Sequence, residues 1–258
     1  MKGYRMIFLK STNEILLMKQ SAELLSQTFG YIKQFIKPGI KTKEIDEKAE
    51  EYILSHNAKP NFKNYNGFPA TLCISVNYQV VHGIPSNYEL KDGDIVSVDG
   101  GLVLNGYHAD MAYTFMIGNV HPNVKKLVEV TKTALYKGID YAKNGMRIGD
   151  IGYAIQTFAE SNGFSVVREL VGHGIGKKLH EEPQVPNYGK SGRGVVLKEG
   201  MTIAIEPMIN LGKKEVLQEK DGWTIVTRDY LPSAHFEHTV AILNQGPQIL
   251  TTYKYIEN

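Results

Sequence analysis

Residues 90–99 read LKDGDIVSVD, and residues 197–206 read LKEGMTIAIE. Each segment passes from a glycine-containing turn into a strand-like run and ends on a carboxylate, Asp99 or Glu206. A second pair of segments also matches, because residues 37–41 (KPGIK) resemble residues 143–147 (KNGMR) and both precede an amphipathic helical pattern. The offsets are 107 and 106 residues, so we infer an internal duplication.

The duplication predicts where chemistry lies in the fold. Each half reads helix, turn, helix and strands, which is an α+β arrangement with approximate two-fold symmetry. Asp99 and Glu206 then face each other across the middle, and two close carboxylates repel unless a cation neutralises them. We expect an N-terminal lead over residues 1–10 and a single catalytic domain over 11–258, with halves of about 11–120 and 121–258.

Composition excludes several classes of protein. Hydrophobic residues make up 42% of the 258-residue chain and charged residues 22%, so it should fold throughout. The 29 Lys and Arg nearly balance 27 Asp and Glu, which argues against a general nucleic-acid or membrane-surface binder, and no direct nucleic-acid motif is present. A single cysteine, Cys73, cannot form an internal disulfide, and no export signal or membrane span is visible. These features predict a cytoplasmic protein.

The chain should open with a helix after residue 10. Ser11 and Glu14 have the spacing of a capping box, and apolar residues continue from Ile15 at helical intervals. The residues before Ser11 carry no clear structural pattern, and either Met1 or Met6 could be the true start.

A hairpin is predicted between residues 95 and 115. Residues 95–99 alternate like a strand, and Asn105-Gly106 suits a two-residue turn before the return strand 107–115. In that register the numbers of facing residues add up to 211, which places Asp110 opposite Gly101 and diagonal to Asp99 on the same face. The two acids could share a cation or could both be solvated on an exposed face. Gly100-Gly101 favours a bulge that directs a side chain towards a site.

Three histidines lie in glycine-containing or polar segments. Residues 172–176 (GHGIG) lack the spacing and the Lys-Ser/Thr ending of a phosphate-binding loop. They leave His173 on a flexible backbone, with His180 seven residues later. A single histidine is more often structural than functional. However, His82 heads the same His-Gly-Ile triplet as His173, which favours a role for all three.

Two further acids end or interrupt apolar strand patterns. Glu206 follows the apolar run 201–205 and precedes Pro207, while Glu237 is the only acid in the strand-like run 234–242. A carboxylate inside an apolar strand needs a partner. The candidate ligands, four carboxylates and one imidazole, suit manganese, iron, cobalt or a catalytic zinc pair; they are Asp99, Asp110, His173, Glu206 and Glu237.

Seven motifs in order resemble those of the type I methionine aminopeptidases, and the match covers nearly the whole chain. The family has a duplicated "pita-bread" fold, an antiparallel sheet with flanking helices, so the same fold is implied here. The motifs are Gly67-Phe68-Pro69, residues 73–77 (CISVN), His82-Gly83-Ile84-Pro85, Asp99 with Asp110, residues 172–176 (GHGIG), residues 180–184 (HEEPQ), and residues 205–208 (IEPM) with Glu237-His238-Thr239.

The resemblance implies an enzyme that removes the initiator methionine from nascent polypeptides when the second residue is small. Two divalent metal ions (Mn, Fe, Co or Zn) would be held by the five candidate ligands, with Asp110 and Glu237 bridging. Activated water would attack the peptide bond with Glu206 as general base, while His82 and His180 contact the substrate's amide. The partners are nascent N-termini, with the ribosome near its exit tunnel as a further candidate.

The resemblance also assigns a pocket for the methionine side chain. Tyr65, Phe68, Cys73 and Trp223 would line it, although aromatic and cysteine side chains at such positions are also ordinary core residues. Leu179 departs from the family, which commonly has an aromatic residue there, so the pocket wall should differ on that side. Asn77 and Ser233 resemble positions that hold a structural monovalent cation.

Two rival functions follow from the same fold. A proline-specific aminopeptidase or prolidase would share the five ligands, but those relatives generally carry an extra N-terminal domain, and only 98 residues precede Asp99 here. A binding protein that has lost catalysis would lack several of the five ligands, and all five are present.

Overall fold

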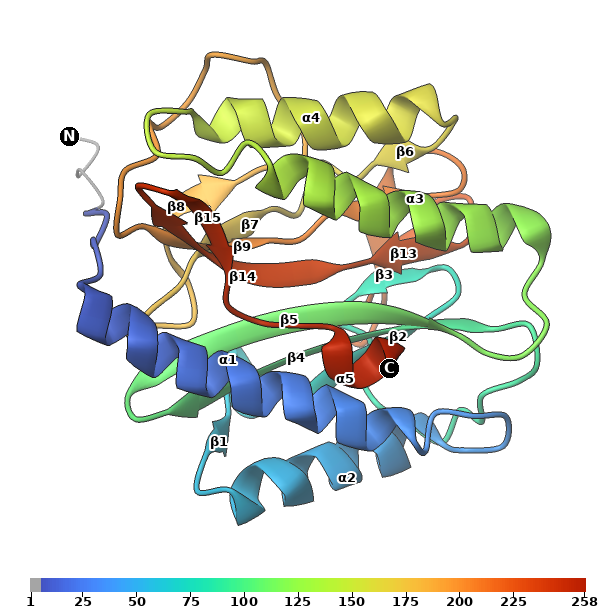
Figure 1. Ribbon diagram of the computed structural model, residues 1–258. Helices are drawn as coiled ribbons and strands as arrows, with labels where there is room; N and C mark the ends of the chain where they lie inside the picture. The colour runs from blue at the N-terminus through green and yellow to red at the C-terminus, as the bar shows by residue number, and fades with distance from the viewer. Residues whose placement is uncertain (1–5) are drawn as a thin grey trace.

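The computed structural model describes residues 6–258, so the first five residues of the predicted N-terminal lead, Met1 included, lie outside the described residues. Two helix pairs flank a curled sheet (Figure 1). Helices α1 (Thr12–Lys33) and α2 (Thr42–Ser55) lie on one side, and α3 (Pro122–Ile139) and α4 (Ile148–Ser161) on the other. A short helix, α5 (Lys254–Glu257), packs beside α1, and η1 (Tyr65–Gly67) is a 3-10 turn. The predicted α+β pita-bread fold is therefore confirmed.

The main sheet is antiparallel throughout and contains the strands that position the site. Its order is β1 (Lys59–Pro60), β4 (Ile95–Leu104), β5 (Tyr107–Met116), β14 (Glu237–Leu243), β9 (Thr202–Ile205), β7 (Gly172–Gly174) and β8 (Glu181–Val185), with β2 (Leu72–Val76) on β4 and β15 (Gly246–Ile249) on β14. A second sheet contains β13 (Ser233–His235), β10 (Met208–Asn210) and β6 (Ser165–Val166). A third sheet contains β11 (Val216–Gln218), β12 (Ile225–Thr227) and β3 (Gln79–Val81).

Helix α1 begins where the capping box predicts. The Ser11 hydroxyl accepts a hydrogen bond from the Glu14 backbone N–H, and the Glu14 carboxylate accepts one from the Ser11 N–H at 2.8 Å. Met18, Leu25 and Phe29 follow at helical spacing and are fully buried against β4 and β5. The helix thereby covers the back of the strands that carry Asp99 and Asp110 at their front.

The β4–β5 hairpin has the predicted register. Asn105 and Gly106 both have positive φ (53° and 78°), and Gly101 pairs with Asp110. The predicted bulge at Gly100-Gly101 is wrong, because pairing continues without a shift from Ile95 to Leu104. The glycines instead allow close packing: a Cβ on Gly100 would lie 2.5 Å from Cδ2 of Leu72.

The backbone hydrogen bonds repeat at the offset found in the sequence. The Gly39 N–H donates to the Leu90 carbonyl at 2.8 Å, and the Gly145 N–H donates to the Leu197 carbonyl at 2.9 Å. Each pair ties the start of a second helix to the turn before a carboxylate-bearing strand. We therefore infer one catalytic domain from residue 11 onward, built of two related halves that divide near residue 120.

The strand-like run 234–242 divides into two strands rather than one. Strand β13 ends at His235 and pairs with β10, whereas β14 begins at Glu237 and pairs with β5 and β9. The alternation of apolar and polar residues indicates a local strand conformation. It does not show that the neighbouring strand changes at Phe236. Among residues 6–258, no helix combines the length and apolar character that crossing a membrane requires.

Candidate active site

Three neighbouring strands bring three carboxylates to one face of the sheet. Asp99 on β4 and Glu237 on β14 lie on either side of the same residue, Ala112 of β5. Asp110 is two residues from Ala112 on β5 and therefore shares its face. The predicted diagonal relation of Asp99 and Asp110 is present, and Glu237 joins them from the other half of the chain.

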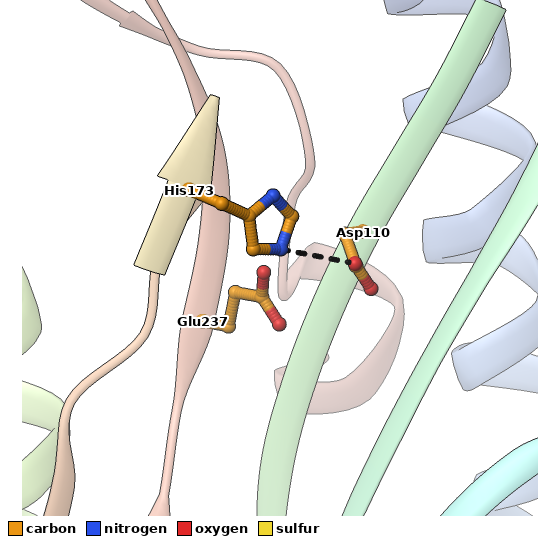
Figure 2. Close-up of side chains that lie close together, drawn as sticks. All are labelled: Asp110, His173 and Glu237. Carbon is orange, nitrogen blue, oxygen red and sulfur yellow. Dashed lines mark ion pairs between the residues drawn. The ribbon is translucent and has the colours of Figure 1, made fainter. Parts of the chain in front are cut away.

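His173 and Glu206 complete the group from strands β7 and β9. Asp110, His173 and Glu237 point towards one another (Figure 2), and their ligand atoms all lie within 4.8 Å of one another. His173 Nε2 is 3.8 Å from Asp110 Oδ2 and 3.6 Å from Glu206 Oε1. Glu206 directly follows the last residue of β9, so the end of that strand delivers it to the cluster.

The tautomer of His173 suits metal binding. Its Nδ1 lies 2.9 Å from the Gly174 carbonyl, which can only accept, so Nδ1 carries the proton and the Nε2 lone pair faces the acids. Burial, with a smaller effect of His180, lowers the pKa of His173 to about 3. The imidazole is therefore neutral at physiological pH, the form that binds a cation.

Buried carboxylate oxygens in this group have no hydrogen-bond partner among the described residues, and a bound cation could take that role. Asp99, Asp110 and Glu237 each have a buried oxygen without a hydrogen-bond partner among the described residues. Burial raises the pKa of Asp99 to about 7 and raises the pKa values of Asp110, Glu206 and Glu237 well above the ordinary range, with neighbouring carboxylates adding to the effect. Several buried acids without counter-charge are costly, and divalent cations would remove that cost. The donor set therefore fits a carboxylate-rich metal site.

Two more histidines border the cluster without joining it. His180 Nδ1 lies 2.8 Å from the Tyr65 hydroxyl, and the His180 ring meets the His173 ring edge-on at 4.3 Å. His82 has a positive φ of 58° and precedes Gly83, where a Cβ would lie 2.3 Å from the Ile74 carbonyl oxygen. Close packing of this backbone against β2 fixes the position of His82.

One cavity of about 210 Å³ connects the cluster to an apolar slot. The Phe68 and Trp223 rings meet edge to face at 5.2 Å, and Cys73 on β2 pairs with Asp99. Leu179, the departure from the resemblance, is buried in the same wall. The cavity is lined by all five predicted ligands, by both other histidines and by every predicted pocket residue, together with Phe62, Asn66 and Leu179.

Asn77 and Ser233 are not among the residues that line this cavity. The Ser233 N–H donates to the Asn77 carbonyl at 2.9 Å, so the two backbones are adjacent. Their side chains are engaged elsewhere, because the Asn77 amide donates to Asp94 and the Ser233 hydroxyl donates to Asn210. A monovalent cation here would be bound by backbone carbonyl oxygens.

His235 was not among the residues that the sequence predicted for the site. The side chain is buried, and neither ring nitrogen has a hydrogen-bond partner among the described residues. Its Nε2 lies 3.9 Å from Glu206 Oε2, so the ring borders the acid cluster. His235 precedes Glu237 by two residues, and period-two spacing in a strand could have indicated the shared face.

Comparison with known proteins agrees with this site. The model of metallopeptidase family M24 matches residues 16–244. A methionine aminopeptidase of Clostridium perfringens is 54% identical over 96% of this chain and 100% of its own length, and methionine aminopeptidase 1 of Bacillus subtilis is 51% identical over 95% and 99%. The crystal structure of methionine aminopeptidase from Rickettsia prowazekii superposes with a TM-score of 0.95 at 42% identity, covering 96% of this chain and all of that one.

Prolidases share the fold at a greater distance. The prolidase of Pyrococcus horikoshii has a TM-score of 0.78 at 24% identity, and the match covers 95% of this chain but 64% of that one. This likeness concerns the fold alone.

Proposed function

This chain belongs to metallopeptidase family M24 and is a methionine aminopeptidase, which removes the initiator methionine from protein N-termini by hydrolysis of the first peptide bond. From that premise we propose how its residues perform the reaction. One observation carries the proposal. A single cavity joins a buried cluster of acids and histidine to an apolar slot of the right character for a thioether.

Asp99, Asp110, His173, Glu206 and Glu237 are the proposed ligands of two divalent metal ions. Asp110 and Glu237 lie on adjacent central strands with His173 close to both, so these three residues would hold the ions at the middle of the group. When bound, such ions lower the pKa of a shared water towards neutrality and polarise the scissile carbonyl. Manganese, iron, cobalt and zinc all suit this donor set.

Glu206 is the proposed general base. Glu206 directly follows the last residue of β9, and its carboxylate lies between His173 and His235. We propose that it accepts a proton from the attacking water and delivers it to the nitrogen of the departing chain. Both transfers need one carboxylate within hydrogen-bond reach of both positions.

His180 and His82 would hold the scissile peptide. Donation from the Tyr65 hydroxyl to Nδ1 would place the proton of the neutral His180 ring on Nε2, from which it could be donated to the carbonyl oxygen as negative charge develops there. Burial lowers the pKa values of His82 and His180, which favours the neutral form of both rings. His82 would contact the peptide nitrogen on the departing side.

The methionine side chain would fill the slot between Phe68, Trp223, Cys73 and Tyr65. Phe68 and Cys73 are buried, and Trp223 packs on Phe68 from the β11–β12 connection. The slot offers aromatic rings and a sulfur to the thioether. We propose that little space remains beside it, so that only a small second residue is accepted.

Peptide selectivity tests this proposal. The kcat/KM for release of methionine from Met-Ala-Ser should exceed that for Met-Lys-Ser and Met-Phe-Ser by roughly 100-fold or more. A bulky second side chain would collide with the residues around the cluster and keep the scissile bond away from it. Amino acid analysis of the products gives the rates. Equal rates, or preferential cleavage before proline whatever the first residue, would assign the chain to a prolidase-like activity instead.

The cellular setting is part of the same proposal. We place the enzyme in the cytoplasm, where nascent N-termini are exposed, with docking near the ribosomal exit tunnel as a way to reach them early. We also propose a structural monovalent cation beside Asn77 and Ser233, bound through main-chain oxygens.

A further inference from the structure

A second hollow adjoins the catalytic cavity. It has a volume of about 610 Å³, within the range of small-ligand sites. Four residues line both spaces, namely His82, His173, His180 and Glu206, so the two are continuous. The methionine slot lies on one side of this group. The residues of the methionine slot line only the smaller space, so a peptide bound there would extend into the larger hollow, here called the exit groove.

The lining of this exit groove is partly apolar and comes from two distant parts of the chain. Leu170, Val171 and Met208 belong to the strands and loops around the site. Met6 and Phe8 belong to the N-terminal segment and are 70% and 51% exposed. Large apolar side chains exposed at the rim of a substrate groove indicate a contact surface.

The N-terminal segment is firmly held in this position. The Lys10 N–H donates to the Gly200 carbonyl at 2.7 Å, and Lys10 Nζ donates to Glu181 Oε2 at 2.6 Å and to the Phe8 carbonyl at 3.2 Å. The Lys10 and Glu181 side chains are both 5% exposed. Figure 1 shows this segment passing the edge of the sheet near β8 before α1 begins. The ion pair thus joins it to the strand that follows His180.

Gly176 makes room for this anchor. A Cβ at that position would lie 2.4 Å from Cε of Lys10, so a larger residue would require the lysine side chain to shift. Because Lys10 binds both Glu181 and the Phe8 carbonyl, the positions of Phe8 and of the β7–β8 connection are coupled.

We propose that Met6 and Phe8 form a substrate-binding wall for the peptide beyond its second residue, and that Phe8 contacts an apolar side chain at the third or fourth position. The inference rests on the proposed function, since it takes the histidine cluster as the place where the peptide bond is cut. The occupant is the substrate itself, because the groove is continuous with the catalytic cavity. The structure thereby assigns specificity to a segment remote from the ligands in sequence.

The test compares two peptides in each enzyme preparation, Met-Ala-Leu-Leu-Ser and Met-Ala-Ser-Ser-Ser. Their ratio of kcat/KM is independent of metal loading and of the fraction of active enzyme. For the unchanged protein we expect roughly a fivefold preference for the leucine peptide, as partial burial of apolar side chains predicts. In Phe8→Ala the ratio should fall below about twofold, and Phe8→Leu should retain most of the preference.

Leu9→Ala is the matched control, because Leu9 is 52% exposed in the same segment and does not line the groove. This variant should keep the ratio of the unchanged protein. A ratio near one in the unchanged protein, or a ratio that Phe8→Ala leaves intact, would overturn the inference. Failure of the proposed function would appear differently, as no release of methionine from either peptide.

Discussion

At the scale of single residues, we propose two functions for Glu206, metal ligand and proton carrier, and one substitution can separate them. Its carboxylate lies 3.6 Å from His173 and 3.9 Å from His235, and burial raises its pKa well above the ordinary range. A bound cation would restore the ionised form. The same group would then serve as ligand and as proton carrier.

Replacing Glu206 with Gln keeps the shape and one ligating oxygen but removes the charge and the basic site. We expect metal affinity to fall and kcat to fall by 10²–10⁴-fold, on the order of 3–5 kcal/mol in the barrier, even at saturating metal. Steady-state kinetics across a metal titration measure both effects. If saturating metal returns kcat to near that of the unchanged protein, Glu206 is a ligand only, and His180 becomes the next candidate for the proton carrier.

Tyr65 offers a finer test, because its hydroxyl lies 2.8 Å from His180 Nδ1 and is the group that we propose directs the His180 proton to Nε2. Tyr65→Phe keeps the ring in the methionine pocket and removes one hydrogen bond. We expect kcat to fall roughly fivefold, as the loss of about 1 kcal/mol of positioning energy implies, while KM for Met-Ala-Ser changes less.

The double variant with His180→Ala decides how Tyr65 acts. If the hydroxyl works only through His180, Tyr65→Phe should have no further effect once His180 is absent. Independent, additive losses would show that Tyr65 acts on the substrate directly.

At the scale of elements, Asp46 joins helix α2 to strand β2. Its Oδ1 accepts a hydrogen bond from the Leu72 N–H at 2.7 Å, next to the strand that carries Cys73. Burial, opposed by hydrogen bonds from Leu72 and Thr71, raises the pKa of Asp46 to about 6, with Glu50 raising it further and Lys63 lowering it. The folded chain therefore holds a proton here that the unfolded chain has released above pH 4.

This arrangement predicts a pH dependence of stability with a definite sign. Between about pH 4 and pH 6 the folded state binds more protons at Asp46, so its contribution to the free energy of unfolding falls as the pH rises, by on the order of 2 kcal/mol. Asp46→Asn should lack this contribution while its amide oxygen still accepts from Leu72. Urea unfolding of both proteins at pH 5 and pH 7.5 measures the difference, and equal pH dependence in the two would contradict the prediction.

At the scale of the whole molecule, the proposed ligands link the two halves of the chain. Asp99 and Asp110 come from the first half, and His173, Glu206 and Glu237 from the second. Ions bound between them would stabilise only the folded state, in which the halves are together. Metal binding should therefore support stability as well as activity.

Chelation should abolish peptidase activity and lower the Tm, and added manganese, cobalt or ferrous ion should restore both. An ion present at 100 times its dissociation constant adds about 2.7 kcal/mol to the free energy of unfolding. Scanning calorimetry of metal-free and reloaded protein measures this, and Asp99→Asn with Glu237→Gln should make the Tm insensitive to metal. Full activity in metal-free protein would exclude the proposed mechanism.

The sequence alone determined those features that depend on neighbours along the chain. The Ser11 capping box and the hairpin register with Gly101 opposite Asp110 rest on local spacing, and the repeat was visible as two pairs of matching segments at offsets of 106 and 107 residues. A register of period two then fixes the face on which Asp99 and Asp110 lie. The prediction of a bulge at Gly100 was wrong because it used only neighbouring residues. The Leu72 side chain, which excludes a Cβ at Gly100, comes from another strand.

Only the tertiary structure decided the contacts between distant segments. Tyr65 and His180 are 115 residues apart, and Lys10 and Glu181 are 171 apart, yet each pair is joined by a hydrogen bond. His235 Nε2 lies 3.9 Å from Glu206 Oε2 although β13 and β9 belong to different sheets. Such contacts follow from how the sheet curls and how its layers pack, and the periodicity of a single segment contains no information about the segment that will lie against it.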